Sequence, residues 1–213
     1  QVWEACMTGK YRMVGDWYSG KGSQAGEDRT CDIHCIIHDE NAYLQTGPNM
    51  KRGIEAHRKM DFVLSKAQFM TTQAMYSDIV LPVTTQWEVP GGLSASNREF
   101  LFCFKQVTEP LYEAKTDVEI NSLIMEAIGV DPKTVYPISP KQAFFNSIAT
   151  ATVIKNDDSG KFETLVTITD EDIAEWGVEG KPQTGRVTLK EFISNGGYQV
   201  ERKKGDKYSS FIG

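Results

Sequence analysis

The sequence predicts an α/β domain with a mostly parallel sheet and helices on both faces. Three short apolar runs, at residues 33–37, 62–64 and 79–81, have the length and composition of buried strands. Residues 48–60 and 71–77, which lie between these runs, carry apolar residues at helical spacing. Strands that alternate with helices in this way pair in parallel through right-handed crossovers. Such sheets bind ligands beyond the carboxyl ends of their strands.

The first run is expected to be buried on both faces, because Ile33, Cys35, Ile36 and Ile37 are apolar and a polar cluster at residues 38–41 ends the run. The second and third runs are also interpreted as strands, and Pro82 is expected to stop the third. A fourth strand is predicted at residues 100–104, after a loop that contains Pro90, Gly91 and Gly92.

Three helices in the second half of the chain are predicted from their N-terminal capping residues. Residues 116–119 (TDVE) form a capping box before a helix at 120–128, and residues 139–142 (SPKQ) cap a helix at 143–151. Residues 188–191 (TLKE) cap a last short helix that ends at Gly196 and Gly197. Between them, residues 155–170 are interpreted as a polar hairpin or loop with a strand at 165–168.

The 213 residues are expected to form one large domain or a domain with an appendage. We predict a loop-rich N-terminal segment at 1–31, an α/β core at 32–154 and a C-terminal extension at 155–213 that leads toward a further domain. Because the sequence starts at Gln1 rather than Met, we expect it to be a piece of a longer protein.

Charge, cysteine count and hydropathy exclude several classes of protein. The chain has 23 basic and 29 acidic residues, and the acidic excess is spread along it, so nucleic-acid binding is not expected. Four unevenly spaced cysteines do not make a disulfide framework. No apolar stretch approaches the ~20 residues that a bilayer span needs, so direct membrane insertion is not expected either.

The sequence carries no clear motif for catalysis or metal binding. Cys31, His34, Cys35 and His38 are zinc-type ligands, but on a strand they would point to opposite faces, so we predict no metal site. The chain has no Gly-x-Ser-x-Gly elbow, and its three histidines fall within 34–57, which disfavours a hydrolase. No glycine-rich dinucleotide loop or Walker lysine loop follows any predicted strand. We therefore predict no catalytic residue.

Polar side chains gather where the predicted strands end. They can donate or accept hydrogen bonds to a base or ribose, although ordinary solvated turns explain each loop equally well. A helix N-terminus after the second strand would also favour a phosphate. The candidate ligand-binding residues are Asp39, Glu40, Asn41 and Gln45 after the first strand, Lys66, Gln68 and Thr71 after the second, and Asn97 before the fourth.

Four segments together resemble the dimethyl sulfoxide reductase family of molybdenum oxidoreductases. They are residues 41–49 (NAYLQTGPN), 69–82 (FMTTQAMYSDIVLP), 96–98 (SNR) and 108–120 (TEPLYEAKTDVEI). The resemblance spans residues 32–130 and is closest to the third domain of the family's catalytic subunits. It implies a Rossmann-like three-layer fold that holds the guanosine end of one molybdopterin guanine dinucleotide. Residues 40, 41, 66–71 and 97 would line the guanosine and pyrophosphate site.

Three positions depart from the family's pattern. Asn97 and Ala67 stand where relatives often carry Asp, and Gln73 stands where they often carry Thr. Asn offers one acceptor and one donor where Asp can accept two guanine donors, so that contact is expected to be weaker or differently arranged here. These departures leave an alternative open, in which the chain is a noncatalytic interaction domain that keeps the fold without the cofactor. A flavodoxin-like or nicotinamide-binding domain is less favoured, because the first turn has no glycine.

The resemblance also implies how the parent protein works. It would transfer two electrons to or from a small molecule at molybdenum, with a bis(molybdopterin guanine dinucleotide) cofactor, as in anaerobic respiration. An iron–sulfur cluster would lie only in an N-terminal part outside this chain, and the isolated chain would be inactive. Its partners would be the other domains of the subunit, an iron–sulfur electron-transfer subunit and a membrane-anchor subunit. The parent would work in the bacterial periplasm or at the membrane, with the cytoplasm as the alternative.

Overall fold

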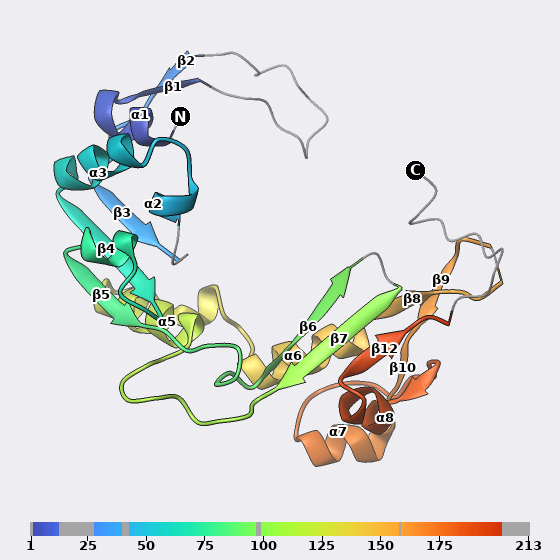
Figure 1. Cartoon of the computed structure of the whole chain (residues 1–213). Coiled ribbons are helices and arrows are strands. Elements are labelled where there is room, and N and C mark those ends of the chain that lie inside the picture. Colours follow the sequence, from blue (N-terminus) through green and yellow to red (C-terminus); the bar gives the residue numbers. More distant parts are fainter. Residues whose placement is uncertain (1, 13–27, 40–42, 97–98, 158, 202–213) are drawn as a thin grey trace. The chain divides into compact units, whose positions relative to one another are not determined.

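The computed structural model describes residues 2–12, 28–39, 43–96, 99–157 and 159–201 (Figure 1). By contact, the chain divides into two compact units. Unit 1 contains residues 1–83 and 113–117, and unit 2 contains residues 84–112 and 118–213. The domain boundaries that the sequence suggested near residues 31 and 154 stay predictions.

The centre of unit 1 is a three-stranded parallel sheet, seen side by side in Figure 1. Its order is β3 (Cys35–His38), β4 (Phe62–Ala67) and β5 (Ile79–Pro82). Because parallel neighbours need a crossover, helices connect them: α2 (Tyr43–Thr46) and α3 (Met50–Lys59) before β4, and α4 (Thr72–Met75) before β5. The three predicted strands and the alternation with helices are confirmed.

Burial within this sheet differs from the prediction. The central strand β4 is buried from Val63 to Ala67, so it is the strand covered on both faces. The first strand, β3, lies at an edge, and Cys35 and Ile37 are exposed on it. The expectation that the first strand is buried on both faces is therefore wrong in unit 1. An apolar run indicates a strand but does not tell which neighbours cover it. Pro82 ends the third strand as expected: it is the last residue of β5, where it pairs with Ala67.

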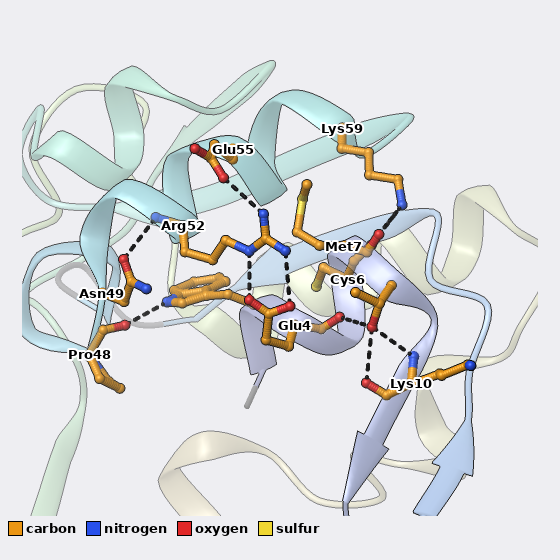
Figure 2. A network of polar contacts seen from close by, with 11 residues as sticks. Glu4, Cys6, Met7, Lys10, Pro48, Asn49, Arg52, Glu55 and Lys59 are labelled. Carbon is orange, nitrogen blue, oxygen red and sulfur yellow. Dashed lines mark hydrogen bonds and ion pairs between the residues drawn. The ribbon is translucent and has the colours of Figure 1, made fainter.

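The N-terminus of unit 1 is a helix and not the predicted loop. Helix α1 (Val2–Thr8) lies against α3, and Trp3 on it is 4% exposed, with its indole nitrogen donating to the Pro48 carbonyl at 3.1 Å. Figure 2 shows the polar contacts that hold it: the Arg52 guanidinium binds both Glu4 oxygens, at 2.6 and 2.9 Å. Lys59 Nζ donates to the Met7 carbonyl at 2.6 Å, near the end of the helix. A seven-residue helix is unstable alone, so its sequence carries little signal without these contacts.

A short antiparallel pair, β1 (Lys10–Arg12) with β2 (Asp28–Thr30), completes the described part of unit 1.

Unit 2 is built on an antiparallel sheet of order β12–β7–β6. Its strands are β6 (Gly91–Ser96), β7 (Phe100–Lys105) and β12 (Gly197–Gln199). The predicted fourth strand thus exists as β7, and it belongs to this antiparallel sheet and not to the parallel sheet of unit 1. It pairs antiparallel with β6 just before it and with β12, almost one hundred residues away in sequence. Pairing between strands so far apart in sequence cannot be inferred from a local apolar pattern.

The remaining elements are mostly short. In chain order they are α5 (Asp117–Ala127), the 3₁₀ turn η2 (Pro132–Thr134), α6 (Pro140–Ala149), β8 (Thr152–Ile154), β9 (Phe162–Thr164), β10 (Val166–Thr167), α7 (Asp170–Trp176), β11 (Val187–Thr188) and α8 (Leu189–Ser194). Strands β8 and β9 pair antiparallel, and β10 and β11 pair in parallel. The core of unit 2 is apolar, with Phe145, Ile148, Leu165, Ile168 and Phe192 at most 1% exposed.

Capping chemistry explains where several helices begin. The Ser139 hydroxyl accepts from the Gln142 amide at 3.1 Å, and Thr188 forms a complete capping box with Glu191, as predicted. A second complete box, between Thr169 and Asp172, opens α7, which the sequence analysis missed by treating residues 155–170 as the end of a loop.

The described residues form a mixed α/β structure, in which β3, β4 and β5 make one parallel sheet and β10 and β11 a second parallel pair. Strands β1, β2, β6, β7, β8, β9 and β12 pair antiparallel. The predicted parallel sheet is therefore confirmed for β3, β4 and β5 but does not extend to the other described strands. Within the same residues, each helix is too short or too polar to cross a lipid bilayer.

Candidate functional site

A buried lysine and two acidic residues meet where the parallel strands of unit 1 end. Asp39 follows β3 directly, and Lys66 is near the end of β4. Asp117, the first residue of α5, reaches the same place, because an isolated parallel bridge pairs Lys115 with Val83 just after β5. Lys66 Nζ lies 2.7 Å from Asp39 Oδ1 and 2.7 Å from Asp117 Oδ1. We call residues 39, 66–71 and 117 the carboxyl edge.

The exposure of these three side chains is very unequal. The Lys66 side chain is 1% exposed, whereas those of Asp39 and Asp117 are 68% and 56% exposed. Burial acts to lower the pKa of Lys66, but hydrogen bonds from its ammonium group to Asp117 and Asp39 outweigh burial and raise the pKa. The lysine is therefore charged, and it fixes two carboxylates that stay open to a ligand. With one cation and two anions, the group as a whole is negative.

The carboxyl edge suits a ligand that donates hydrogen bonds. A carboxylate accepts several N–H or O–H donors, and such charge-assisted bonds are about twice as strong as neutral ones. A phosphate would instead be repelled by the two acidic residues. The helix N-terminus expected to hold a phosphate is also weaker than predicted. Helix α4 has only four residues, and the Thr71 hydroxyl already accepts one of its amides, that of Ala74, at 3.3 Å.

Some of the other predicted site residues lie at or near the carboxyl edge, and others fall outside the described residues. Gln68 is exposed directly after β4, and Thr71 is the N-cap of α4, so both share the carboxyl edge with Lys66. Gln45 is exposed on α2, which lies beside α4. Glu40, Asn41 and Asn97 fall outside the described residues.

Two residues that the sequence analysis did not select as ligands organise this region. Asp117 was interpreted only as part of a capping box, although it lies in a segment that carries the family resemblance. Gln73 is fully buried, and its side-chain oxygen accepts from the Leu44 amide at 3.1 Å, which ties α2 to α4. A buried glutamine after a predicted strand is the available signal, but its burial cannot be inferred from sequence alone.

Unit 1 also contains a buried pair of histidines, His38 and His57. His38 directly precedes Asp39 in the sequence. His38 Nε2 is 2.8 Å from His57 Nε2, and the two rings stack. His57 Nδ1 is 2.6 Å from the Gly53 carbonyl, which can only accept, so this nitrogen carries the proton. His38 Nε2 and His57 Nε2 then share one hydrogen between the two rings. Burial, followed by the neighbouring His57, lowers the pKa of His38 to about 4.

The Cys31, His34, Cys35 and His38 tetrad does not converge. His34 is exposed and lies between Asp61 and Asp32, at 2.6 and 3.2 Å, whereas His38 points into the interior. Across the residues that the structure describes, no three His, Cys, Asp or Glu side chains are grouped as metal ligands.

Comparisons with known proteins place these residues in a broader context. A family model described as molybdopterin oxidoreductase matches residues 23–127, which include Asp39, Lys66 and Asp117. A dimethyl sulfoxide/trimethylamine N-oxide reductase of Cereibacter sphaeroides is 32% identical over 114 residues, which cover 46% of this chain and 14% of the relative. Formate dehydrogenase H of Escherichia coli K12 is 35% identical over 86 residues, covering 40% of this chain and 12% of the relative.

A putative formate dehydrogenase of Staphylococcus aureus USA300 is also similar, at 32% identity over 82 residues. That match covers 38% of this chain and 8% of the relative. The chain thus spans only a small part of the curated relatives that it matches.

Proposed function

Because the chain belongs to the molybdopterin oxidoreductase family, we propose that its carboxyl edge binds the guanosine end of one molybdopterin guanine dinucleotide. The chain would be one part of a longer molybdenum oxidoreductase that transfers two electrons to or from a small molecule. When bound, the molybdenum centre supplies the redox chemistry. The residues of this chain bind and orient the nucleotide end, and none of them acts on the substrate.

The observation that carries the proposal is the pair of exposed carboxylates held by Lys66 at 2.7 Å each. Guanine presents adjacent N–H donors on one edge, and ribose presents two hydroxyls, so both match an acceptor-rich surface. An acidic residue just after a strand of a parallel sheet is a common partner of ribose hydroxyls. The donor set therefore fits a guanosine better than it fits a phosphate.

The positive charge of Lys66 suggests a contact with the pyrophosphate, but its role in this proposal is to position the two acids. Because both acidic residues occupy its ammonium group, it positions Asp39 and Asp117 instead of contacting the pyrophosphate. The pyrophosphate would lie away from these acids. Gln68 and Thr71 are proposed to contact the nucleotide, as are Gln45, Glu40, Asn41 and Asn97.

Several finer features of the parent protein belong to the same proposal. The three parallel strands would form the middle layer of a Rossmann-like domain. The complete enzyme would carry the bis(molybdopterin guanine dinucleotide) form, an iron–sulfur cluster in another part, and the redox and anchor subunits that the resemblance implies. Anaerobic respiration is the proposed setting.

Calorimetric titration of the 213-residue chain with GMP and with AMP tests the proposal. AMP lacks the donor edge of guanine, so GMP should bind at least about tenfold more tightly, as one or two charge-assisted hydrogen bonds provide. Asp39→Asn should weaken GMP binding by about tenfold or more. Glu126→Gln, an exposed acid farther along α5, serves as the control and should leave it unchanged.

Equal binding of GMP and AMP, or an Asp39→Asn variant that binds like the parent chain, would contradict the proposal. A chain that binds neither nucleotide would favour the alternative, a noncatalytic interaction domain. One observation supports that alternative: Ala67, at a position where relatives often carry Asp, is 5% exposed and offers a ligand no polar group.

A further inference from the structure

Unit 2 contains a pocket of about 420 Å³ that the proposed nucleotide site does not use. Its wall is formed where the end of β7, the first turn of α6 and the last turn of α7 approach one another. The lining residues are Pro90, Lys105, Gln106, Lys141, Phe144, Glu175, Trp176 and Ile193. All of them belong to unit 2.

The floor of the pocket is apolar and well packed. Phe144 is 7% exposed, and its ring centroid lies 5.7 Å from that of Trp176 at a tilt of 46°. Gly91 makes this packing possible, because a Cβ there would fall 2.3 Å from the Phe144 ring. Phe144 can therefore lie against β6 only if residue 91 has no side chain. The aromatic floor is thus a fixed feature of unit 2.

The rim of the pocket carries more positive than negative charge. Lys105 and Lys141 line it, opposed by a single acid, Glu175. Within the described ranges, no hydrogen bond or ion pair engages either lysine ammonium group. In a chain of net charge −6, two such lysines beside one aromatic pocket are available for an anion.

We propose that this pocket binds a small carboxylate with an aromatic body. The carboxylate would lie between Lys105 and Lys141, and the ring would lie on Trp176 and Phe144. A volume of 420 Å³ is near the lower end of ligand pockets, which span about 300–1,000 Å³. It suits a single ring with a short acidic side chain and not a dinucleotide.

The position of the pocket in the sequence separates it from the proposed cofactor site. The family match ends at residue 127, whereas Lys141, Phe144, Glu175, Trp176 and Ile193 lie beyond it. Most of the pocket is therefore built by a part of the chain that the matched family region does not include. The inference does not depend on nucleotide binding in unit 1.

Titration with 3-phenylpropionate, followed by saturation-transfer NMR on the 213-residue chain, tests the proposal. The acid should bind at least about tenfold more tightly than its neutral isostere 3-phenylpropionamide, because only the acid makes charge-assisted bonds. Propionate, which lacks the ring, should bind more weakly than both. Affinity for 3-phenylpropionate should fall as salt rises, and GMP should not displace it.

A lysine variant provides the matched comparison. Lys105→Gln with Lys141→Gln should weaken binding of the acid by about tenfold and leave binding of the amide unchanged. Both side chains are exposed, so the fold should persist, and the dispersion of the amide spectrum checks this. Lys181→Gln, an exposed lysine of the same unit outside the pocket, should have no effect.

Three results would overturn the proposal. Equal affinity for acid and amide would show that the lysines do not select an anion and would leave the pocket as an apolar seat for a neighbouring domain. Binding that survives in the double lysine variant, or no binding at about 10 mM acid, near the weak limit of specific recognition, would exclude the site.

Discussion

Removing Lys66 should destabilise unit 1 less than removing both acids that bind it. The Lys66→Met variant keeps the buried aliphatic stem and takes away the charge. Asp39 and Asp117 are more than half exposed, so water can solvate them once the lysine is gone. Their mutual repulsion in water-like surroundings is about 1 kcal/mol, and we expect a total cost of about 1–2 kcal/mol.

Replacing both acids instead leaves Lys66 without its two carboxylates. The Lys66 side chain is 1% exposed in the intact structure. Breaking a buried pair from this side costs about 3–5 kcal/mol, because the remaining charge loses the carboxylates that offset its desolvation. The Asp39→Ala/Asp117→Ala variant should therefore lose about 2 kcal/mol or more beyond Lys66→Met. Asp170→Ala, which removes the exposed first residue of α7, controls for the loss of an acid from a helix N-terminus.

Native-state hydrogen exchange at the β4 amides measures these differences within unit 1 itself. Exchange of central-strand amides reports the opening free energy of the structure around them. The reasoning would be refuted if Lys66→Met opened β4 more readily than the double acid variant. It would be refuted equally if the double variant matched the Asp170→Ala control.

Two further predictions concern stability. His38 is held neutral in the fold with its pKa lowered from 6.5 to about 4, so the unfolded chain takes up its proton first. Stability from this group is present above pH 6.5 and is lost as pH falls toward 4, by about 3 kcal/mol in total. Urea unfolding against pH should show this loss, and His38→Gln should remove that part of it. At Gly197, φ is +146° and a Cβ would lie 2.3 Å from the Leu101 carbonyl oxygen, so Gly197→Ala should cost over about 2 kcal/mol in chemical unfolding. Gly177→Ala, at φ +59° with open space, should cost only about 1 kcal/mol, and equal losses would contradict the steric argument.

The parallel sheet could be predicted from sequence because its signals are local. The runs that became β3, β4 and β5 are apolar and bounded by polar turns, and α3 between two of them has helical spacing. Which strand lies in the centre is not a local property. Ile37 looks as apolar as Val63, yet one is 55% exposed on an edge and the other is 1% exposed.

The partner of β7 could not be predicted for a related reason. Its residues alternate, with Leu101 and Cys103 buried and Phe100 and Phe102 exposed, which indicates a strand with one face on a core. That alternation fits an antiparallel sheet, but its partner β12 forms only where the chain returns at Gly197.

The candidate site was partly predictable. Asp39 and Lys66 were selected because the carboxyl ends of parallel strands meet at one edge. Asp117 was missed, since its place depends on the return of the chain from unit 2 to the bridge between Lys115 and Val83. A helix-capping motif predicts where a helix begins in the sequence, but not where its first turn lies in the fold. The ion pair of Asp117 with Lys66 can be identified only when the path of the chain back to unit 1 is known.

Amide chemical-shift mapping of the 213-residue chain during a GMP titration reports which residues bind guanosine. The amides of Asp39, residues 66–71 and Asp117 should shift together and saturate with one binding constant, while those around Phe144 and Trp176 stay in place. AMP at the same concentration should shift the amides of the carboxyl edge much less. Shifts that cluster elsewhere in the chain, or that are the same for both nucleotides, would contradict the assignment of the carboxyl edge as the guanosine site.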